Sequence, residues 1–278
     1  MDYSHKIGRA KELIAHADAV LIGAGAGFSA AAGLHYSGPE FEHDFADFIR
    51  NYGITDLYTS SFYPFSTEEE RWAYWARHIY TIRYKPEVLP LYQKLLQLVV
   101  DKDYFVITTN VDGQFRKAGF CPERLFEVQG DYGLNQCLCG CHDALYNNEN
   151  LVRQMVATTH DCRIPSRLVP VCPRCGGRME VHVRKDEYFV QDAAWHAAYK
   201  RYQQYVNNLE TRKSVVLLEL GVGFNTPTII RYPFEIMAES YSNTTLIRIN
   251  KSETTTFLDN NSRMLLLAKD ANVLYLLV

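Results

Sequence analysis

Short apolar runs without polar alternation recur along the chain and predict buried β-strands. They occupy residues 19–22, 104–108, 125–128, 215–220, 245–249 and 264–267. Segments with apolar residues at helical spacing alternate with these runs and predict helices. The helical segments are residues 7–17, 89–100, 114–118, 226–237 and 271–277. This alternation indicates a parallel sheet covered on both faces, so the expected fold class is α/β with a Rossmann-like parallel sheet.

Two segments interrupt the alternation. Residues 35–86 are rich in Phe, Tyr and Trp and carry a helical pattern, whereas residues 130–192 hold six of the seven cysteines and little strand pattern. Both follow predicted strands, at the edge where an open α/β sheet places its ligand crevice. We therefore expect a large domain of residues 1–34, 87–129 and 193–278. The two insertions should form a smaller domain with a helical module and a zinc module.

Composition and charge narrow the function only slightly. A chain of 278 residues with 47% hydrophobic content can bury a full core. The formal charge of −3 gives no electrostatic case for a nucleic-acid partner or an anionic membrane. Residues 1–17 lack the apolar core of a signal peptide, and no run approaches ~18 apolar residues. The sequence therefore predicts a cytoplasmic protein that binds neither nucleic acid nor membrane.

The first predicted strand runs into a glycine-rich turn, GAGAGFSAAAG at residues 23–33. Glycine lets a backbone approach a phosphate, and the helix that follows supplies N–H groups. A tight turn without a ligand fits the same residues. We expect valine at Gly25 or Gly27 to block a ligand while the fold survives. An ordinary dinucleotide fold has an acidic residue ~20 positions onward, but GPEFEHDFADF at that distance has no strand pattern. This argues against a typical dehydrogenase.

Five cysteines form two clusters with metal-binding spacing. Cys137, Cys139 and Cys141 lie in the first, and Cys172 and Cys175 form a C-x-x-C-G knuckle in the second. Four thiolates in tetrahedral geometry suit a closed, structural zinc site. Either Cys137 or Cys139 can pair with Cys141, and the wider pair is favoured. The expected zinc ligands are Cys137, Cys141, Cys172 and Cys175; the alternative is a set of free thiols.

Polar or glycine-bearing turns follow four of the predicted strands. Asn110 and Asp112 follow residues 104–108, and Gln129 follows residues 125–128. A G-x-G turn at Gly221 and Gly223 and the side chain of Asn250 end two later strands. Each turn alone also fits a helix cap or an Asx turn. Because the carboxyl ends of parallel strands meet at one edge, the four together favour a ligand site there.

In order and spacing, these motifs resemble the sirtuins over nearly the whole chain. The matching motifs are GAGFS-x-x-x-G, TTNVDGQF, two cysteine pairs, a G-x-G turn and an I-N strand end. The resemblance implies NAD bound in a cleft between a Rossmann-like domain and a small zinc-containing domain. It assigns NAD binding to Gly25, Ala26, Gly27, Phe28, Ser29, Tyr36, Thr109, Asn110, Asp112, Gln129, Gly221, Gly223, Asn225, Asn250 and Asp270.

Two departures distinguish the chain from sirtuins that deacylate lysine. Those sirtuins carry a histidine-glycine pair where this chain has Gln129-Gly130. Histidine can accept a proton near neutral pH, whereas a glutamine amide has no usable base. The sequence HYSG at residues 35–38 also replaces the usual proline-aspartate-phenylalanine-arginine. Together with QGDYG, these departures resemble the class M sirtuins of microbes. That group is associated with protein ADP-ribosylation, a macrodomain partner and a lipoyl-carrying, glycine-cleavage-H-like acceptor.

The resemblance thus implies an NAD-dependent protein ADP-ribosyltransferase, with one structural zinc and with Asn110, Asp112 and Gln129 as catalytic residues. ADP-ribosyl transfer requires loss of nicotinamide and a positioned acceptor, but deacylation also requires a base. The competing functions are an NAD-dependent lysine deacylase, a slow NAD hydrolase, and a non-catalytic module that binds NAD and zinc.

Overall fold

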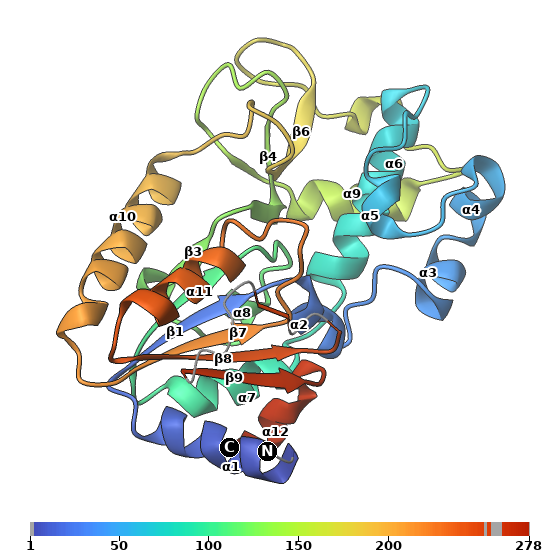
Figure 1. Ribbon diagram of the computed structural model, residues 1–278. Coiled ribbons are helices and arrows are strands. Elements are labelled where there is room, and N and C mark those ends of the chain that lie inside the picture. Colours follow the sequence, from blue (N-terminus) through green and yellow to red (C-terminus); the bar gives the residue numbers. More distant parts are fainter. Residues whose placement is uncertain (1–2, 253–254, 257–262, 278) are drawn as a thin grey trace.

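The computed structural model describes residues 3–252, 255–256 and 263–277. Among these residues, six parallel strands form the central sheet in the order β3-β2-β1-β7-β8-β9 (Figure 1). The strands are β1 (Ala19–Ala24), β2 (Asp103–Thr108), β3 (Leu125–Glu127), β7 (Val215–Leu220), β8 (Thr244–Asn250) and β9 (Met264–Ala268). All six lie where the apolar runs predict them. Counted along this sheet alone, the order is the 3-2-1-4-5-6 of Rossmann folds, which confirms the expected fold class.

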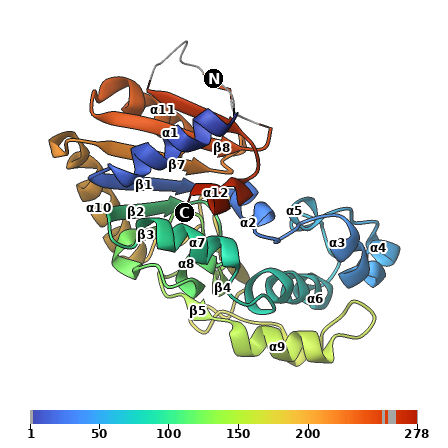
Figure 2. The ribbon, with the colours of Figure 1, turned by 90° about the horizontal axis from the view of Figure 1, so that it is seen from below.

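Alternate strand residues face two layers of helices. Val20 and Ile22 of β1 face α1 (Tyr3–Ala15), α7 (Pro90–Val99) and α12 (Leu274–Leu277). Ala19 and Leu21 face the opposite layer, which contains α10 (Ala193–Asn207) and α11 (Arg231–Ser240). Figure 2 shows α10 at the β3 side of the sheet and α1 lying across the strands. Because both faces are covered, the strands need no polar alternation.

Two helices differ from the sequence-based expectation. The helix expected at residues 226–237 begins only at Arg231, which puts Pro233 in its first turn. A start at 226 would place this proline in the helix interior, where its ring collides with the preceding turn. Helix α10 was not predicted. Its aromatic residues, including Trp195, Tyr202 and Tyr205, pack only partly buried against the sheet.

The first insertion is helical, as its pattern predicts. It contains α3 (Pro39–Asp44), α4 (Ala46–Tyr52), α5 (Leu57–Ser60), α6 (Glu68–Ile79) and a π-helical turn, η1 (Tyr80–Tyr84). A capping box begins α6: the Thr67 hydroxyl accepts from the Glu70 N–H, and the Glu70 carboxylate accepts from the Thr67 N–H. Trp72 and Trp75 are buried on this helix.

The second insertion contains a sheet that its sequence pattern did not predict. Its antiparallel strands run in the order β5-β4-β6, with bounds β4 (Gly130–Cys137), β5 (Tyr146–Asn147) and β6 (Met179–Val183). Helix α9 (Glu149–Thr158) follows β5. The strand signal is weak because buried positions in β4 and β6 include polar residues, among them Gln136 and Glu180. One apolar cluster joins both insertions, for example through Trp72 and Met155.

The remaining elements are short. They are α2 (Ala26–Ala31), α8 (Gln114–Lys117), η2 (Pro122–Arg124), η3 (Ser166–Leu168), η4 (Leu209–Thr211) and η5 (Ala271–Val273). In the part of the chain that the structure describes, every helix is too short or too polar to cross a membrane.

Candidate functional site

The candidate site lies where the order of the large sheet reverses, between β1 and β7. The turns that follow these strands leave the sheet at the same edge, because the strands pair in parallel with Ala24 opposite Leu220. The turn after β2 is also there, since the Thr109 N–H donates to the Ala24 carbonyl at 3.1 Å. An open α/β sheet binds its ligand at this topological switch point.

The glycines of the first turn pack directly on the turn after β7. A Cβ added to Gly25 would lie 2.8 Å from the Gly221 oxygen, and one on Gly27 would lie 2.9 Å from the Gly221 Cα. The Gly27 N–H donates to the Gly221 oxygen at 3.0 Å. Gly221 itself has a positive φ of +59°. The expectation that valine at Gly25 or Gly27 spares the fold is therefore wrong, because the side chain would first separate these two turns.

Asn110 and Asp112 belong to a buried network of hydrogen bonds. The Ser29 hydroxyl donates to the Asp112 carboxylate at 2.6 Å, and the Tyr92 hydroxyl lies 2.9 Å from the Ser29 oxygen. The other Asp112 oxygen accepts from the Gln114 N–H at 2.9 Å. Burial raises the pKa of Asp112, and the bonds from Ser29 and Gln114 oppose that rise. Sequence motifs from α2 and the turn after β2 thus meet at one point.

Gln129 lies between β3 and β4 and has an unusual polar environment. Its side-chain oxygen is buried and accepts no hydrogen bond from any described residue. A buried acceptor without a partner costs free energy, so a donor from a bound group would stabilise it. Gly130 follows with a φ of +102°, and a Cβ there would lie 2.1 Å from the His182 oxygen. The backbone next to Gln129 is therefore tightly specified.

The opposite end of the edge is formed by the turns after β7 and β8. The Asn250 amide donates to the Val222 oxygen at 2.9 Å, as does Arg231 at 3.0 Å. Arg231 also lies with its guanidinium 4.0 Å from the centre of the exposed Phe224 ring. Asn250 thus connects the turns after β7 and β8, which the sequence predicts to contact the same ligand.

The other residues predicted to bind NAD are spread along this edge. Phe28 turns its ring into the core against Tyr92, with ring centres 4.5 Å apart. The Tyr36 hydroxyl donates to that of Tyr132 at 3.4 Å. Asn225 is exposed, and the exposed Asp270 accepts from the Asn272 N–H at 3.0 Å as a helix cap. Binding of NAD by individual residues stays a prediction.

Sequence reasoning missed a charged group that joins three segments of the site. Arg83 of η1 binds Asp131 of β4 through two hydrogen bonds of 2.8 and 3.1 Å. A Cβ on Gly113, in the turn after β2, would lie 2.3 Å from the Arg83 guanidinium carbon. Nearby, burial raises the pKa of Glu127 to about 7, and Asp131 adds to this shift. The sequence offered only the aspartate of QGDYG, and no local pattern identifies its partner 48 residues away.

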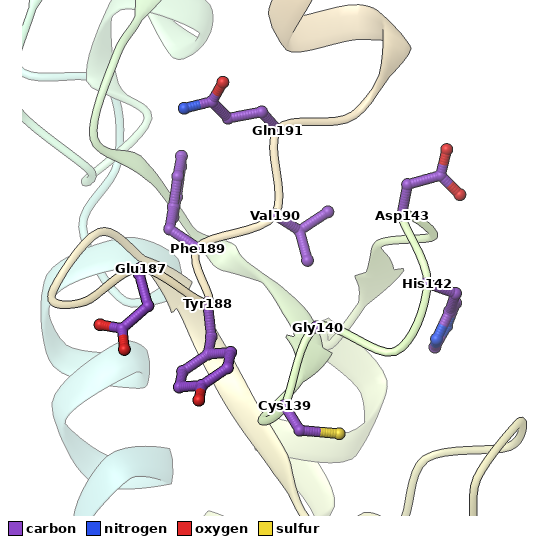
Figure 3. Close-up of a pocket in the computed structure, with 9 residues that line it drawn as sticks. All are labelled: Cys139, Gly140, His142, Asp143, Glu187, Tyr188, Phe189, Val190 and Gln191. Atoms are coloured by element: carbon purple, nitrogen blue, oxygen red, sulfur yellow. The ribbon is translucent and has the colours of Figure 1, made fainter.

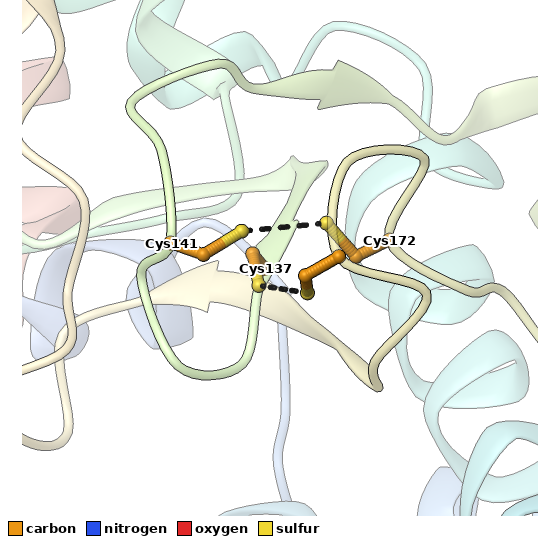
Figure 4. A group of neighbouring side chains, drawn as sticks. Cys137, Cys141 and Cys172 are labelled. Atoms are coloured by element: carbon orange, nitrogen blue, oxygen red, sulfur yellow. Dashed lines mark hydrogen bonds between the residues drawn. The ribbon is translucent and has the colours of Figure 1, made fainter.

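Four cysteines of the second insertion converge as predicted. The thiols of Cys137, Cys141, Cys172 and Cys175 all lie within 4.8 Å of one another. Cys137 is 3.7 Å from Cys175, and Cys141 is 3.7 Å from Cys172 (Figure 4). The exposed Cys139 thiol contacts Cys137 at 3.5 Å but does not belong to the group of four. Four thiols at this separation fit a tetrahedral Zn²⁺ ion.

Two hollows are lined mainly by residues of the two insertions. A pocket of about 330 Å³ lies between residues 187–191 and four residues around the first cysteine knuckle, Cys139, Gly140, His142 and Asp143 (Figure 3). A groove of about 650 Å³ opens between residues 33–45 and residues 81–89. Gly33, the last residue of the glycine-rich segment 23–33, is among the residues that line this groove.

Comparisons with known proteins agree with this architecture. No protein-family model matches the chain. A protein ADP-ribosyltransferase of Staphylococcus aureus is 39% identical over 240 residues, which cover 86% of this chain and 76% of that protein. A probable bifunctional ADP-ribose hydrolase/ADP-ribosyltransferase of Fusarium oxysporum is 36% identical over 256 residues, and the match spans 41% of its length.

Solved Sir2 structures share the fold at low sequence identity. A structure of Sir2Tm bound to a propionylated peptide has a TM-score of 0.63 and 16% identity, covering 97% of this chain and 96% of that one. A Sir2 homolog–NAD complex has a TM-score of 0.60 and 17% identity, covering 97% and 92%. With the bacterial relative at 39% identity, the chain belongs to the family of sirtuin-type protein ADP-ribosyltransferases.

Proposed function

We propose that this protein transfers ADP-ribose from NAD to a protein acceptor and releases nicotinamide. The observation that carries the proposal is the buried set of Asn110 and Asp112 beside Ser29, combined with Gln129 where lysine-deacylating sirtuins have histidine. Two relatives above 30% identity are named for ADP-ribosyl transfer, which supports the same chemistry.

The proposed roles follow from the chemistry of each side chain. NAD supplies the ADP-ribosyl group, with nicotinamide as the leaving group. We propose that Asp112 binds the carboxamide of nicotinamide, because a buried carboxylate is a strong acceptor for the N–H groups of an amide. Asn110 would orient the ribose. The unpartnered side-chain oxygen of Gln129 would accept a hydrogen bond from a ribose hydroxyl. In the reaction the bond from ribose to nicotinamide breaks, the acceptor atom bonds to the same carbon, and its proton passes to solvent.

The absence of a base at Gln129 is what favours transfer over deacylation. Deacylation requires a proton to be taken from a ribose hydroxyl, and an amide cannot take it. Transfer relies on positioning and on electrostatic stabilisation instead. The buried Asp112 and the network around it are suited to that role.

We further propose the arrangement of domains and partners. Residues 35–86 and 130–192 would form a small domain around one structural zinc, supported by the apolar cluster that joins both insertions. The first acceptor to test is a lipoyl-carrying protein, as the resemblance to class M sirtuins suggests. A macrodomain partner that removes ADP-ribose fits the fungal relative, which is named for both activities.

Labelled NAD tests the proposal directly. Wild type should transfer label to the carrier protein and leave acyl-lysine peptides intact. Asn110→Ala should abolish transfer, whereas Asn207→Ala, at an exposed asparagine on α10, should not. Gln129→Ala should weaken transfer by about 1–3 kcal/mol of transition-state stabilisation. Robust deacylation by wild type, with no label on any protein, would overturn the proposal.

Gln129→His gives a sharper comparison. It restores a base at the position where deacylating sirtuins have one, so any deacylation should appear only in this variant. If wild type and Gln129→His deacylate equally, Gln129 does not decide the outcome of the reaction.

A further inference from the structure

We infer that Tyr92 is a positioning residue for nicotinamide release, because its hydroxyl links the Ser29–Asp112 pair to the Asn110 amide. The inference rests on the proposed function and adds a residue outside the motifs at the sheet edge. Tyr92 lies in the first turn of α7, a helix that otherwise covers the sheet. Its side chain is fully buried.

The direction of each hydrogen bond follows from the groups involved. Ser29 has one hydroxyl proton, which it donates to Asp112 at 2.6 Å. The 2.9 Å contact between Ser29 and Tyr92 must therefore use the Tyr92 proton. The Tyr92 oxygen in turn accepts from the Asn110 side-chain amide at 3.4 Å. The result is one continuous chain of hydrogen bonds that runs from the Asn110 amide through Tyr92 and Ser29 to the Asp112 carboxylate.

This chain determines how the Asn110 amide faces. One amide hydrogen points to Tyr92 and the other to the Gly25 carbonyl, 3.1 Å away. The assignment of oxygen and nitrogen in an asparagine follows from such a network. The Asn110 oxygen accepts no bond from any described residue, so it is left for a bound hydroxyl group or water.

The ring and the hydroxyl of Tyr92 have separate roles. The ring packs between Phe28 and Phe115, with centres 4.5 and 4.9 Å away, so phenylalanine would preserve the core. Only the hydroxyl reaches Ser29 and Asn110. The hydroxyl therefore connects α7 to both the glycine turn and the turn after β2. In this proposal it holds Ser29 and Asn110 at the fixed distance that nicotinamide release requires.

Tyr92→Phe and Tyr104→Phe form a matched pair of variants. Tyr104 is a second buried tyrosine of the same core, at the opposite end of β2, and its hydroxyl accepts from the Cys121 N–H at 3.2 Å. Both variants lose one buried hydroxyl and should lose similar thermal stability. Only Tyr92→Phe should lower kcat for nicotinamide release, by about tenfold, with the Kd for NAD changed less than about threefold.

The experiment measures nicotinamide release by stopped assay and NAD binding by calorimetry. In ¹⁵N-labelled protein, the Asn110 side-chain amide signal should move in Tyr92→Phe and stay in Tyr104→Phe. Equal kcat in wild type and Tyr92→Phe, or equal losses in both variants, would overturn the inference alone. Absence of nicotinamide release in wild type would overturn the proposed function, and this inference with it.

Discussion

The large sheet and the two insertions hold together in different ways. In β7 every residue is buried, and all but one of its side chains are apolar. In the small sheet, buried positions include Asn135, Gln136 and Glu180, together with the Cys137 thiol. Burial of apolar area is non-directional and favours the large sheet without specific partners. The stability of the small sheet also depends on partners for its buried polar groups and its thiol.

The partners of those polar groups come from distant parts of the chain. The Gln136 amide donates to the Tyr188 oxygen at 2.9 Å and accepts from the Val190 N–H at 3.0 Å. Glu180 accepts from Arg71 of α6 at 3.1 Å. The stability of the insertions is therefore more sensitive to single substitutions than that of the large sheet. Four experiments test this difference.

Loss of zinc should have the largest effect. Structural zinc contributes about 10–16 kcal/mol of apparent binding free energy in small zinc domains, so Cys172→Ala should unfold the small sheet. Hydrogen exchange should rise in β4 and β6 and stay slow in β1 and β7. Cys139→Ala is the control, since this exposed thiol is outside the group of four. Equal effects of the two substitutions would show that the ligand set is different.

Breaking a buried ion pair between β7 and β8 should lower the free energy of unfolding by about 3–5 kcal/mol. Glu219 is fully buried and accepts from Arg248 at 2.6 and 2.8 Å. Glu219→Gln removes one of the two buried carboxylates beside Arg248 and leaves Glu235, 2.6 Å away, as its remaining counter-charge, so the urea midpoint should fall. Glu210→Gln, at an exposed position, should leave the midpoint unchanged. A similar midpoint in both variants would contradict the importance of this ion pair.

Widening the contact between the two turns of the site should cost about 1–3 kcal/mol. Gly27→Ala forces its Cβ against Gly221 backbone atoms 2.9 Å away. Gly8→Ala, in α1 with nothing within 4 Å of the added Cβ, should instead stabilise by up to about 1 kcal/mol. Thermal unfolding distinguishes the two, and a stabilising Gly27→Ala would show that the turns can separate freely.

Mild acid should weaken the insertions through His78. This side chain is fully buried on α6, and burial lowers its pKa from 6.5 to about 3. The unfolded chain therefore binds more protons between these values, so the free energy of unfolding falls as pH drops below 6.5, by about 1.4 kcal/mol per pH unit. His78→Phe should flatten this slope, and His43→Gln, at an exposed position, should not. An unchanged slope in His78→Phe would refute the prediction.

Local patterns in the sequence determined the large sheet and much of the site. Apolar runs mark all six strands because a strand buried on both faces needs no distant information to be recognised. Asn110, Asp112 and Gln129 could be placed at one edge because the carboxyl ends of parallel strands meet there. Their roles in binding and catalysis stay predictions. The cysteine spacing favoured Cys137 over Cys139 as the partner of Cys141, and the structure brings the favoured four thiols together.

Other features depend on contacts between residues far apart in the chain. Tyr92 looks like any core position of a helix, and only packing brings its hydroxyl to Ser29, 63 residues away in sequence. Arg83 meets Asp131 in the same way, at a separation of 48 residues. The partners that satisfy buried polar groups in the small sheet also come from other elements. A periodic pattern reports which face of an element is buried, but only the tertiary structure decides which polar atoms meet there.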